Sequence, residues 1–455
     1  MPPSSYYHVI PLSNFARGYD KYRRCYDKAR LSESTYPGQF FVLKREDLSV
    51  GIEKVSRLID RLKLHKDRLL VLEATLPSTS LFPNKRTGLG QYLEGSALPI
   101  TRLWFLDAQE ALVPVTTEEA YAASLITLNP VLPPFQGLTP RTLSVLPIAR
   151  ACQAACAFCF SESSASLEQV PSPLNLSLID AYCRRALAAG ASRFVITGGG
   201  EPGLLAHTQL LALIRTGRSY FDKVVLITNG VHLSKQEEQA GFAMLSDYEQ
   251  AGLTVLSISR HHNDPARNKV IMGLDTRTEK VLGLLKGLRK ERSSLLPAVQ
   301  ARLICVLQQG GVENEASLRN YVDWAVGQGV TEICFKELYV ASTLESVYHT
   351  QKEHQWSQDH QVPLLLVTSF FANNGFAVVT CLPWGAPVFE GTWHGIRLRV
   401  AAYTEPNVFW ERSNGVARSW NVMADGTCLV SLEDPTSTLV LPGARRVIAL
   451  KESRD

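Results

Sequence analysis

Strand-like and helix-like segments alternate through the middle of the chain, and this alternation limits the possible folds more than any other feature. Between about Arg141 and Val340 the strand-like segments are short runs rich in Val, Ile and Leu. Such runs are typical of parallel strands that helices cover on both faces of a sheet. The expected strands are 142–147, 193–197, 223–228, 254–259, 299–307 and 331–339, and the expected helices are 178–189, 205–216, 235–251, 276–289 and 315–327.

Six successive units of this kind predict an α/β protein with an open parallel sheet or a barrel between residues 136 and 345. In both architectures ligands bind at the carboxyl ends of the strands. Residues 1–135 are expected to form an N-terminal domain of unknown role, with a basic helix-like stretch at Ile52–Leu70. Residues 346–455, rich in Trp, Tyr and Val, are expected to be a mostly β region that caps the substrate site.

Composition narrows the functional classes. The chain has 455 residues, of which 45% are hydrophobic and 20% charged, so it is neither fibrous nor disordered. A net charge of +4 is too small to favour nucleic acid as a partner. No membrane-spanning run or secretory signal is apparent, and nine cysteines without a disulfide pattern suit a reducing compartment. We therefore expect a cytoplasmic protein.

Three cysteines, Cys152, Cys156 and Cys159, follow the first expected strand with C-x3-C-x2-C spacing. Thiolates spaced in this way can bind three irons of a [4Fe–4S] cube. The fourth iron would then be open to a substrate or cofactor, as in other catalytic metal sites. Structural zinc is an alternative, but it needs four ligands, and the next candidates are Cys183, in an expected helix, and His207. Buried thiols that bind no metal are a further alternative.

Polar or glycine-rich residues also mark the later strands. The second strand ends in Gly198-Gly199-Gly200-Glu201-Pro202, where glycines allow a ligand to approach the backbone closely. Each of these residues has a structural interpretation when taken alone, but together they point to one end of one sheet. On the remaining strands the candidates are Thr228, Ser257, Arg302 and Glu337.

With these residues in view, the segment from about 142 to 339 resembles the radical S-adenosylmethionine (radical SAM) superfamily, most closely the branch that contains the molybdenum-cofactor cyclase and peptide-modifying enzymes. The resemblance implies the family's partial (βα)6 TIM-like barrel. It also implies that Cys152, Cys156 and Cys159 bind a [4Fe–4S] cluster. Phe158 would lie beside the adenine of S-adenosylmethionine (SAM). The other SAM-binding positions that it implies are Gly199, Gly200, Glu201, Pro202, Thr228 and Ser257, with Arg302 and Glu337 as further carry-overs.

The resemblance implies an activity as well. Family members cleave SAM reductively to a 5′-deoxyadenosyl radical, which removes hydrogen from a substrate, and they receive electrons from a donor such as flavodoxin or ferredoxin. An auxiliary cluster is not expected, since only Cys381 and Cys428 lie beyond the core. Cys305 and Cys334, on neighbouring expected strands, are either small buried residues or a thiol that returns a hydrogen atom to the substrate.

The substrate class stays open between a ribosomal peptide and a small molecule such as an amino acid, sugar or nucleoside. A peptide substrate predicts a leader-binding winged-helix fold in the first 140 residues. A small molecule predicts a closed pocket covered by the C-terminal region. The alternative from another functional class is a non-catalytic iron–sulfur or zinc binding module with an interaction role.

Overall fold

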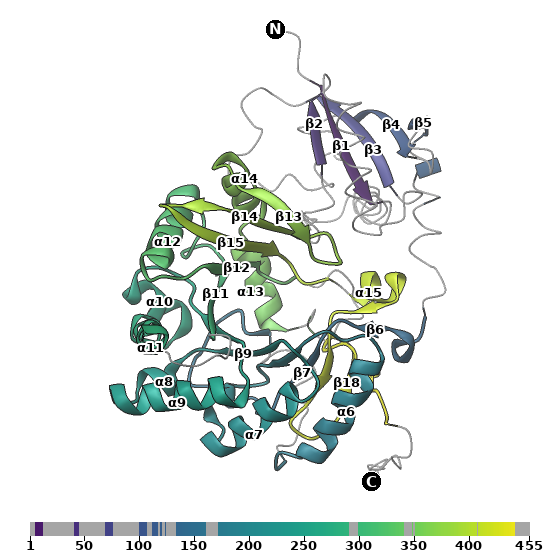
Figure 1. The fold of residues 1–455 in the computed structure, drawn as a ribbon. Coiled ribbons are helices and arrows are strands. Elements are labelled where there is room, and N and C mark those ends of the chain that lie inside the picture. The colour runs from purple at the N-terminus through teal and green to yellow at the C-terminus, as the bar shows by residue number, and fades with distance from the viewer. Residues whose placement is uncertain are drawn as a thin grey trace.

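The computed structural model describes residues 5–11, 41–44, 69–75, 100–106, 112–116, 119–120, 123, 133–160, 172–290, 299–340, 348, 351–406 and 408–441. Most of the described strands belong to two sheets, a small one near the N-terminus and a large one that helices accompany (Figure 1). The large sheet contains the segment with alternating strands and helices, and it is the part of the fold that positions the candidate site.

The N-terminal strands form a five-stranded antiparallel sheet in the order β2-β1-β3-β4-β5. Of the helix-like stretch predicted at Ile52–Leu70, residues 52–68 lie outside the described residues, and Leu69 and Leu70 begin strand β3. The five strands are β1 (Ser5–Pro11), β2 (Phe41–Lys44), β3 (Leu69–Thr75), β4 (Ile100–Leu106) and β5 (Leu112–Pro114).

All six predicted core strands are present, parallel and neighbours in chain order, which confirms the predicted α/β fold with a partial barrel. Their apolar residues explain this arrangement. Leu143, Phe194 and Val224 occupy adjacent register positions, and all three are buried in the core between the sheet and the helices. The strands are β7 (Leu143–Val145), β8 (Phe194–Ile196), β9 (Val224–Thr228), β10 (Val255–Ser259), β11 (Gln300–Leu307) and β12 (Glu332–Glu337).

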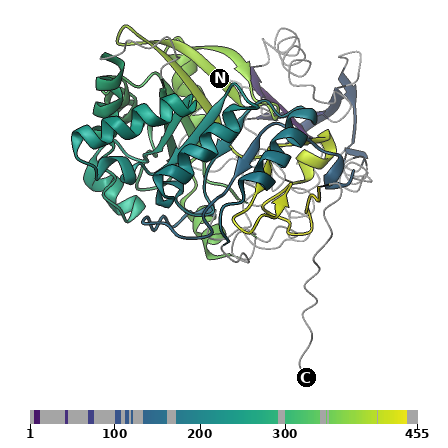
Figure 2. The ribbon, with the colours of Figure 1, turned by 60° about the horizontal axis from the view of Figure 1, so that its bottom comes forward.

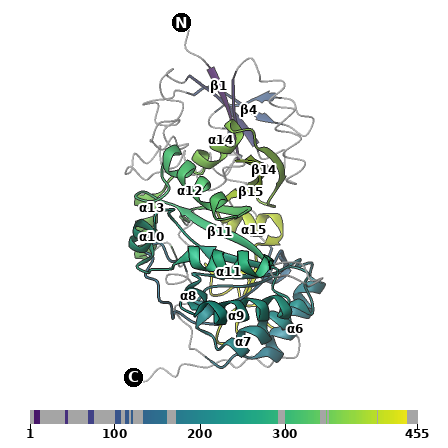
Figure 3. The ribbon, with the colours of Figure 1, turned by 60° about the vertical axis from the view of Figure 1, so that its left-hand side comes forward.

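The helices that connect these strands lie one after another along the outer side of the sheet (Figure 3). Three of them have side-chain caps at their N-termini: Asn175 accepts from the amide of Leu178, Asp264 accepts from the amides of Ala266 and Arg267, and Asn314 forms a capping box with Ser317. Helix α10 was not predicted from the sequence. The helices are α6 (Leu176–Ala188), α7 (His207–Arg218), α8 (Val231–Ser234), α9 (Glu238–Ala251), α10 (Pro265–Met272), α11 (Thr278–Lys290) and α12 (Glu315–Gly327).

The C-terminal region contains the expected strands, but two of them extend the barrel sheet at its two edges. Strand β15 pairs in parallel with β12, and β17 pairs in parallel with β7, so β17 lies beside a strand almost 280 residues earlier (yellow beside blue in Figure 2). Parallel strands therefore run without interruption from β17 through the six core strands to β15. The strands are β13 (Ala377–Cys381), β14 (Pro387–Trp393), β15 (Ile396–Tyr403), β16 (Val416–Ala417), β17 (Trp420–Val422) and β18 (Cys428–Leu429).

Three helices also belong to this region, which is therefore less purely β than predicted. Helix α14 covers β15: Phe370 and Phe371 pack in the same apolar core as Leu398 and Val400. Every second residue of β15 thus faces a helix, and the residues between them face the barrel interior or solvent. The helices are α13 (Lys352–His360), α14 (Leu365–Asn373) and α15 (Val408–Asn414).

Candidate functional site

A cavity of about 720 Å³ occupies the barrel interior. Its walls follow from the alternation of side chains along each strand. In β7, Leu143 and Val145 pack against the helices, so Ser144 between them faces the cavity, and in β8 Val195 does the same between Phe194 and Ile196. The three motif cysteines line the cavity at the carboxyl ends of the strands.

The cysteine loop follows β7 and is held in place by backbone hydrogen bonds. The amide of Cys159 donates to the carbonyl of Cys156 at 3.1 Å, and the amide of Ala155 donates to the carbonyl of Met272 at 2.8 Å. The Cys152 side chain is exposed, and those of Cys156 and Cys159 are partly buried. The predicted ligands therefore share one short loop whose middle is attached to the C-terminal end of α10.

The electrostatics of this loop suit a cationic cluster. Burial raises the pKa of the Cys156 thiol to about 12, and the neighbouring Cys159 and Cys152 raise it further. A bound metal replaces the thiol proton and removes this repulsion between the sulfurs. Among the described residues no three His, Cys, Asp or Glu side chains converge on a position for one metal ion.

The glycine segment after β8 packs directly on the cysteine loop. The amide of Arg150 donates to the carbonyl of Gly199 at 2.5 Å, and the amide of Glu201 donates to the carbonyl of Ala151 at 2.8 Å. Gly199 has a φ of 106°, and a Cβ on Gly200 would lie 2.3 Å from the Ala151 carbonyl oxygen. Only glycine allows this approach, so the two motifs, predicted separately, form one unit.

Glu201 connects the ends of the second and third core strands. Its Oε1 accepts from the Thr228 hydroxyl at 2.5 Å and from the Gly203 amide at 2.8 Å, and its Oε2 accepts from the Asn229 amide at 2.9 Å. Burial raises the pKa of Glu201, and these three hydrogen bonds oppose that rise. The carboxylate and the Thr228 hydroxyl thus position their loops, while Pro202, Glu201 and Thr228 also line the cavity.

Asn229 is a site residue whose role the sequence did not indicate. Its side-chain amide donates to Gln153 Oε1 at 3.2 Å and lies 3.9 Å from Cys152 Sγ. The side-chain oxygen Oδ1 of Asn229 accepts from the backbone amide of Val231, which fixes the orientation of the Asn229 side chain. Asn229 therefore connects the end of β9 to the start of the cysteine loop, and its place in the Thr228-Asn229-Gly230 strand end is the signal that could have identified it.

Phe158, expected near the adenine, lies between two other rings that line or adjoin the cavity. Its ring contacts His261 edge-to-face with 5.1 Å between centroids, and it lies 6.0 Å from the ring of Trp356 in α13. His261 Nδ1 accepts from the amide of Val306 at 3.0 Å, which assigns the ring proton to Nε2. Burial lowers the pKa of His261 to about 3, so the ring stays neutral. His261 was not predicted.

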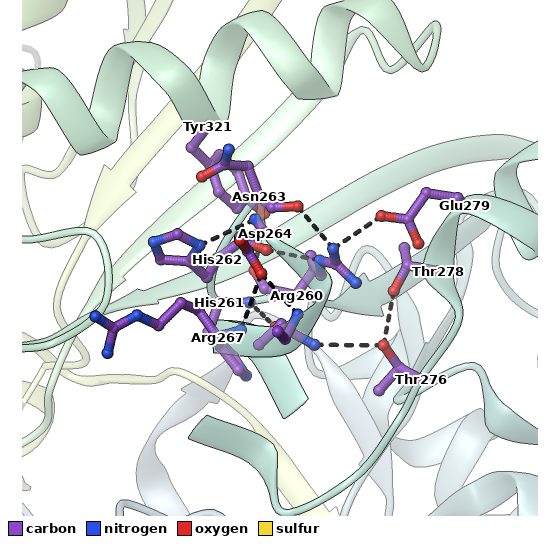
Figure 4. A network of polar contacts seen from close by, with 12 residues as sticks. Arg260, His261, His262, Asn263, Asp264, Arg267, Thr276, Thr278, Glu279 and Tyr321 are labelled. Atoms are coloured by element: carbon purple, nitrogen blue, oxygen red, sulfur yellow. Dashed lines mark hydrogen bonds and ion pairs between the residues drawn. The ribbon is translucent and has the colours of Figure 1, made fainter. Parts of the chain in front are cut away.

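A polar network holds the loop that carries His261 (Figure 4). The buried guanidinium of Arg260 donates to the carbonyl groups of His262 and Asn263 at 2.7 and 2.8 Å, and it forms an ion pair with Glu279 at 2.8 Å. The amide of His261 donates to Asn268 Oδ1 at 2.8 Å. Since α10 follows this loop and ends at the contact with the cysteine loop, the network supports both.

Ser257 and Arg302 lie deeper than the resemblance implied. Ser257 is fully buried and its hydroxyl accepts from Arg302 Nε at 2.7 Å, while Ser259, two residues nearer the carboxyl end, lines the cavity. Arg302 also lines the cavity and forms an ion pair with Glu332 at 3.4 Å. Ser257 is the central residue of β10 and Arg302 the third residue of β11, so neither of these two predicted SAM contacts lies at the carboxyl end of its strand.

The structure separates the two candidate thiols. Cys305 belongs to the apolar core on the helix side of the sheet, where its Sγ lies 3.7 Å from the His261 carbonyl oxygen, whereas Cys334 lines the cavity. Of these two thiols, Cys334 alone lines the cavity. Glu337 lines the cavity as well, and its Oε1 accepts from the Leu364 amide at 3.4 Å.

An ion-pair network that was not predicted from the sequence connects the two edges of the barrel sheet, where β15 and β17 of the C-terminal region lie. Glu405, just after β15, forms ion pairs with Lys336 of β12 at 2.6 Å and with Arg418, just before β17, at 3.0 Å. Burial alone would raise the pKa of Glu405, but the two cations lower it to about 2. We call Lys336, Glu405 and Arg418 the ionic clasp, since these side chains join strands at opposite edges of the parallel sheet.

Comparison with known proteins relates the middle of the chain to a known family. Residues 146–297 match the family model described as the Radical SAM superfamily. The chain is 25% identical over 266 residues to a probable GTP 3′,8-cyclase of Sulfurisphaera tokodaii. The matched segment covers 55% of this chain and 76% of that protein. No helix among the described residues is long and apolar enough to cross a membrane.

Solved structures with similar folds include Streptococcus suis SuiB bound to S-adenosylmethionine, with a TM-score of 0.42, 13% identity, and coverage of 70% of this chain and 67% of that chain. Coproporphyrinogen III oxidase (HemN) of Escherichia coli has a TM-score of 0.34, 12% identity, and coverage of 56% of both chains. The family match includes the cysteine loop, the glycine segment and Asn229. Residues 146–297, about a third of the chain, therefore form a radical SAM domain.

Proposed function

We propose that this enzyme binds a [4Fe–4S] cluster through Cys152, Cys156 and Cys159, binds SAM at the adjoining strand ends, and acts on a small molecule inside the barrel. When bound, the cluster and SAM supply a 5′-deoxyadenosyl radical that removes a hydrogen atom from the substrate. The chain's own residues hold the cysteine loop, orient the ligands and limit the access of water.

One observation carries this proposal. The cysteine loop, the glycine segment and Asn229 come from three different strand ends, yet direct hydrogen bonds join them at one end of a single cavity. Gly200 and Glu201 line the same cavity as the cysteines, where SAM would contact both the open iron and the protein.

A small-molecule substrate is supported by the size of the cavity and by the origin of its walls. Its volume of about 720 Å³ lies within the range of small-molecule sites. Tail-derived strands extend both edges of the barrel, and the ionic clasp joins them. Because Cys334 lines this cavity, we propose it rather than Cys305 as the thiol nearest the substrate.

The test is anaerobic reconstitution of the full chain with iron and sulfide, followed by incubation with SAM and dithionite. We expect a brown protein that releases 5′-deoxyadenosine. Cys156→Ala should lose both the colour and the release of 5′-deoxyadenosine, yet remain folded, since it removes a ligand from a partly buried loop. Its matched control is Cys183→Ala, a buried thiol of α6 in the apolar core, which should keep both properties.

Two results would contradict the proposal. One is a Cys156→Ala protein that keeps a full cluster. The other is a colourless wild-type protein that purifies with zinc and releases no 5′-deoxyadenosine, which would favour a non-catalytic binding module. Circular dichroism of each variant separates loss of the cluster from loss of the fold.

A further inference from the structure

Five cationic side chains line the cavity at the end opposite the cysteine loop. One of them, Arg399 of β15, lies opposite Glu332 in the register and forms an ion pair with Glu390 at 3.3 Å. The other four belong to the core strands or precede them. Arg193 and Lys223 immediately precede β8 and β9, Arg141 comes two residues before β7, and Arg302 is the third residue of β11. The amino ends of parallel strands meet at one edge of a sheet, so these four residues, which we call the basic cluster, share one end of the barrel.

The basic cluster has too few carboxylates to balance it. Glu332, the first residue of β12, lies opposite Arg302 in the register and forms an ion pair with it at 3.4 Å. Among the described residues, Arg141, Arg193 and Lys223 form no ion pair. The other carboxylates that line the cavity have other partners. Glu201 accepts from Thr228 and two amides, Glu337 accepts from the Leu364 amide, and Glu405 belongs to the ionic clasp.

The cations also affect one another. Burial, followed by the charge of Arg193, lowers the pKa of Arg141 to about 10, and burial, followed by the charge of Arg302, lowers the pKa of Arg193. Burial also lowers the pKa of Lys223. The negative charge of Glu332 raises this pKa, and the positive charges of Arg193 and Arg302 lower it further. Moreover, Nη1 of Arg141 and Nε of Arg193 are buried and have no hydrogen-bond partner. Buried donors without acceptors are costly, and an anionic ligand would satisfy them.

We propose that the basic cluster binds a multiply charged oxyanion of the substrate, such as a phosphate ester, a diphosphate or a pair of carboxylates. This inference rests on the proposed function and adds the chemical class of the substrate. Four cations that face one carboxylate leave three positive charges unbalanced, which suits an anion with two or more negative charges better than a single carboxylate. Arginine guanidinium groups bind phosphate and carboxylate oxygens through paired donors.

The distance along the barrel agrees with a small substrate. Arg193, in the basic cluster, and Thr197, beside the glycine segment, are four residues apart along one strand, and both line the cavity. At about 3.3 Å per residue this separation is about 13 Å. A molecule of nucleotide size can therefore place its anionic group in the basic cluster and a carbon atom near the cysteine loop.

The test is isothermal titration calorimetry of the full chain, reconstituted with iron and sulfide, with inorganic pyrophosphate and separately with citrate. Binding of pyrophosphate alone would identify a phosphate site, and binding of citrate alone a carboxylate site; both support the inference. We expect Arg193→Gln and, as a second variant, Lys223→Gln to weaken binding at least tenfold. The control Arg184→Gln removes an exposed cation of α6, 64% exposed, and should leave binding unchanged.

The inference is wrong if neither anion binds the wild-type chain with a Kd below about 1 mM. It is also wrong if both folded variants bind the anions as tightly as the wild type does. Release of 5′-deoxyadenosine from SAM without substrate is measured on the same preparation. A protein that cleaves SAM but binds neither anion refutes this inference alone, whereas one that binds pyrophosphate but holds no cluster refutes the proposed function.

Discussion

Gly199→Ala should disrupt the contact between the glycine segment and the cysteine loop. Gly199 has a φ of 106°, which L-residues rarely adopt, and an added Cβ would lie 2.5 Å from the Ile148 carbonyl oxygen. The backbone conformation costs about 1–2 kcal/mol and overpacking about 1–3 kcal/mol, so we expect a loss of about 3 kcal/mol in the free energy of unfolding. Because the Arg150 amide donates to the Gly199 carbonyl, any relief of this strain moves the cysteine loop.

Urea denaturation gives the free energy of unfolding, and iron content per chain after anaerobic reconstitution gives the state of the loop. We expect Gly199→Ala to show a lower unfolding midpoint and less than half the iron of the wild type. The control is Gly283→Ala, in the middle of α11, where an added Cβ meets no atom within 4 Å. It should raise stability by about 0.5–1 kcal/mol. A Gly199→Ala protein with wild-type stability and a full cluster would refute the reasoning.

Three further predictions concern buried polar groups. Glu405→Gln leaves Lys336 and Arg418 without their carboxylate and should lower the free energy of unfolding by about 3 kcal/mol at pH 7. The folded-state pKa of Glu405 is about 2 and its ordinary value is 4.5, so this stabilisation is present above pH 4.5 and is lost as the pH falls toward 2; denaturation curves of variant and wild type should converge there. Burial raises the pKa of Glu411 to about 8, so its contribution is fully present below pH 4.5 and is lost as the pH rises through 8. Glu411→Gln keeps an acceptor for the Arg418 amide and should therefore be more stable, relative to wild type, at pH 9 than at pH 5 in thermal melts. Asn229→Ala removes the contacts to Gln153 and Cys152 and should speed the loss of iron to a chelator several-fold, whereas an equal rate would show that these contacts do not hold the loop.

The core strands could be predicted because each is a local run of apolar residues between turn signals. Helix α10 was missed, although Asp264 caps it and Pro265 begins it, because the helix is short and mostly polar and its packing face depends on the neighbouring loops. The pairing of β15 with β12 and of β17 with β7 joins residues that are far apart in the chain. Local pattern identifies such strands but carries no information about their partners.

At the site, the cysteine ligands and the glycine segment could be predicted because their spacing is local. The hydrogen bonds that join them could not, because they connect the ends of different strands. The choice between the two thiols could have been predicted from the sequence. Side chains alternate along a strand, so Arg302, Ile304 and Val306 face the cavity and Cys305 faces the helices. The same alternation places Cys334 on the face of Glu332 and Lys336.

Alternation also places Arg193 and Lys223 inside the barrel, since they share a face with Val195 and Val225, which line the cavity. A cation immediately before a strand is usually solvated, so its position alone predicts no ligand. The C-terminal region changes the expectation that these cations are solvated. Strands β15 and β17 continue the parallel sheet at both edges, and the ionic clasp joins those edges through side chains. The cations of the basic cluster are thus enclosed on sides where a bare six-stranded barrel would admit water. The C-terminal strands and the basic cluster therefore belong to one cavity, whose walls at both edges of the sheet come from the C-terminal region.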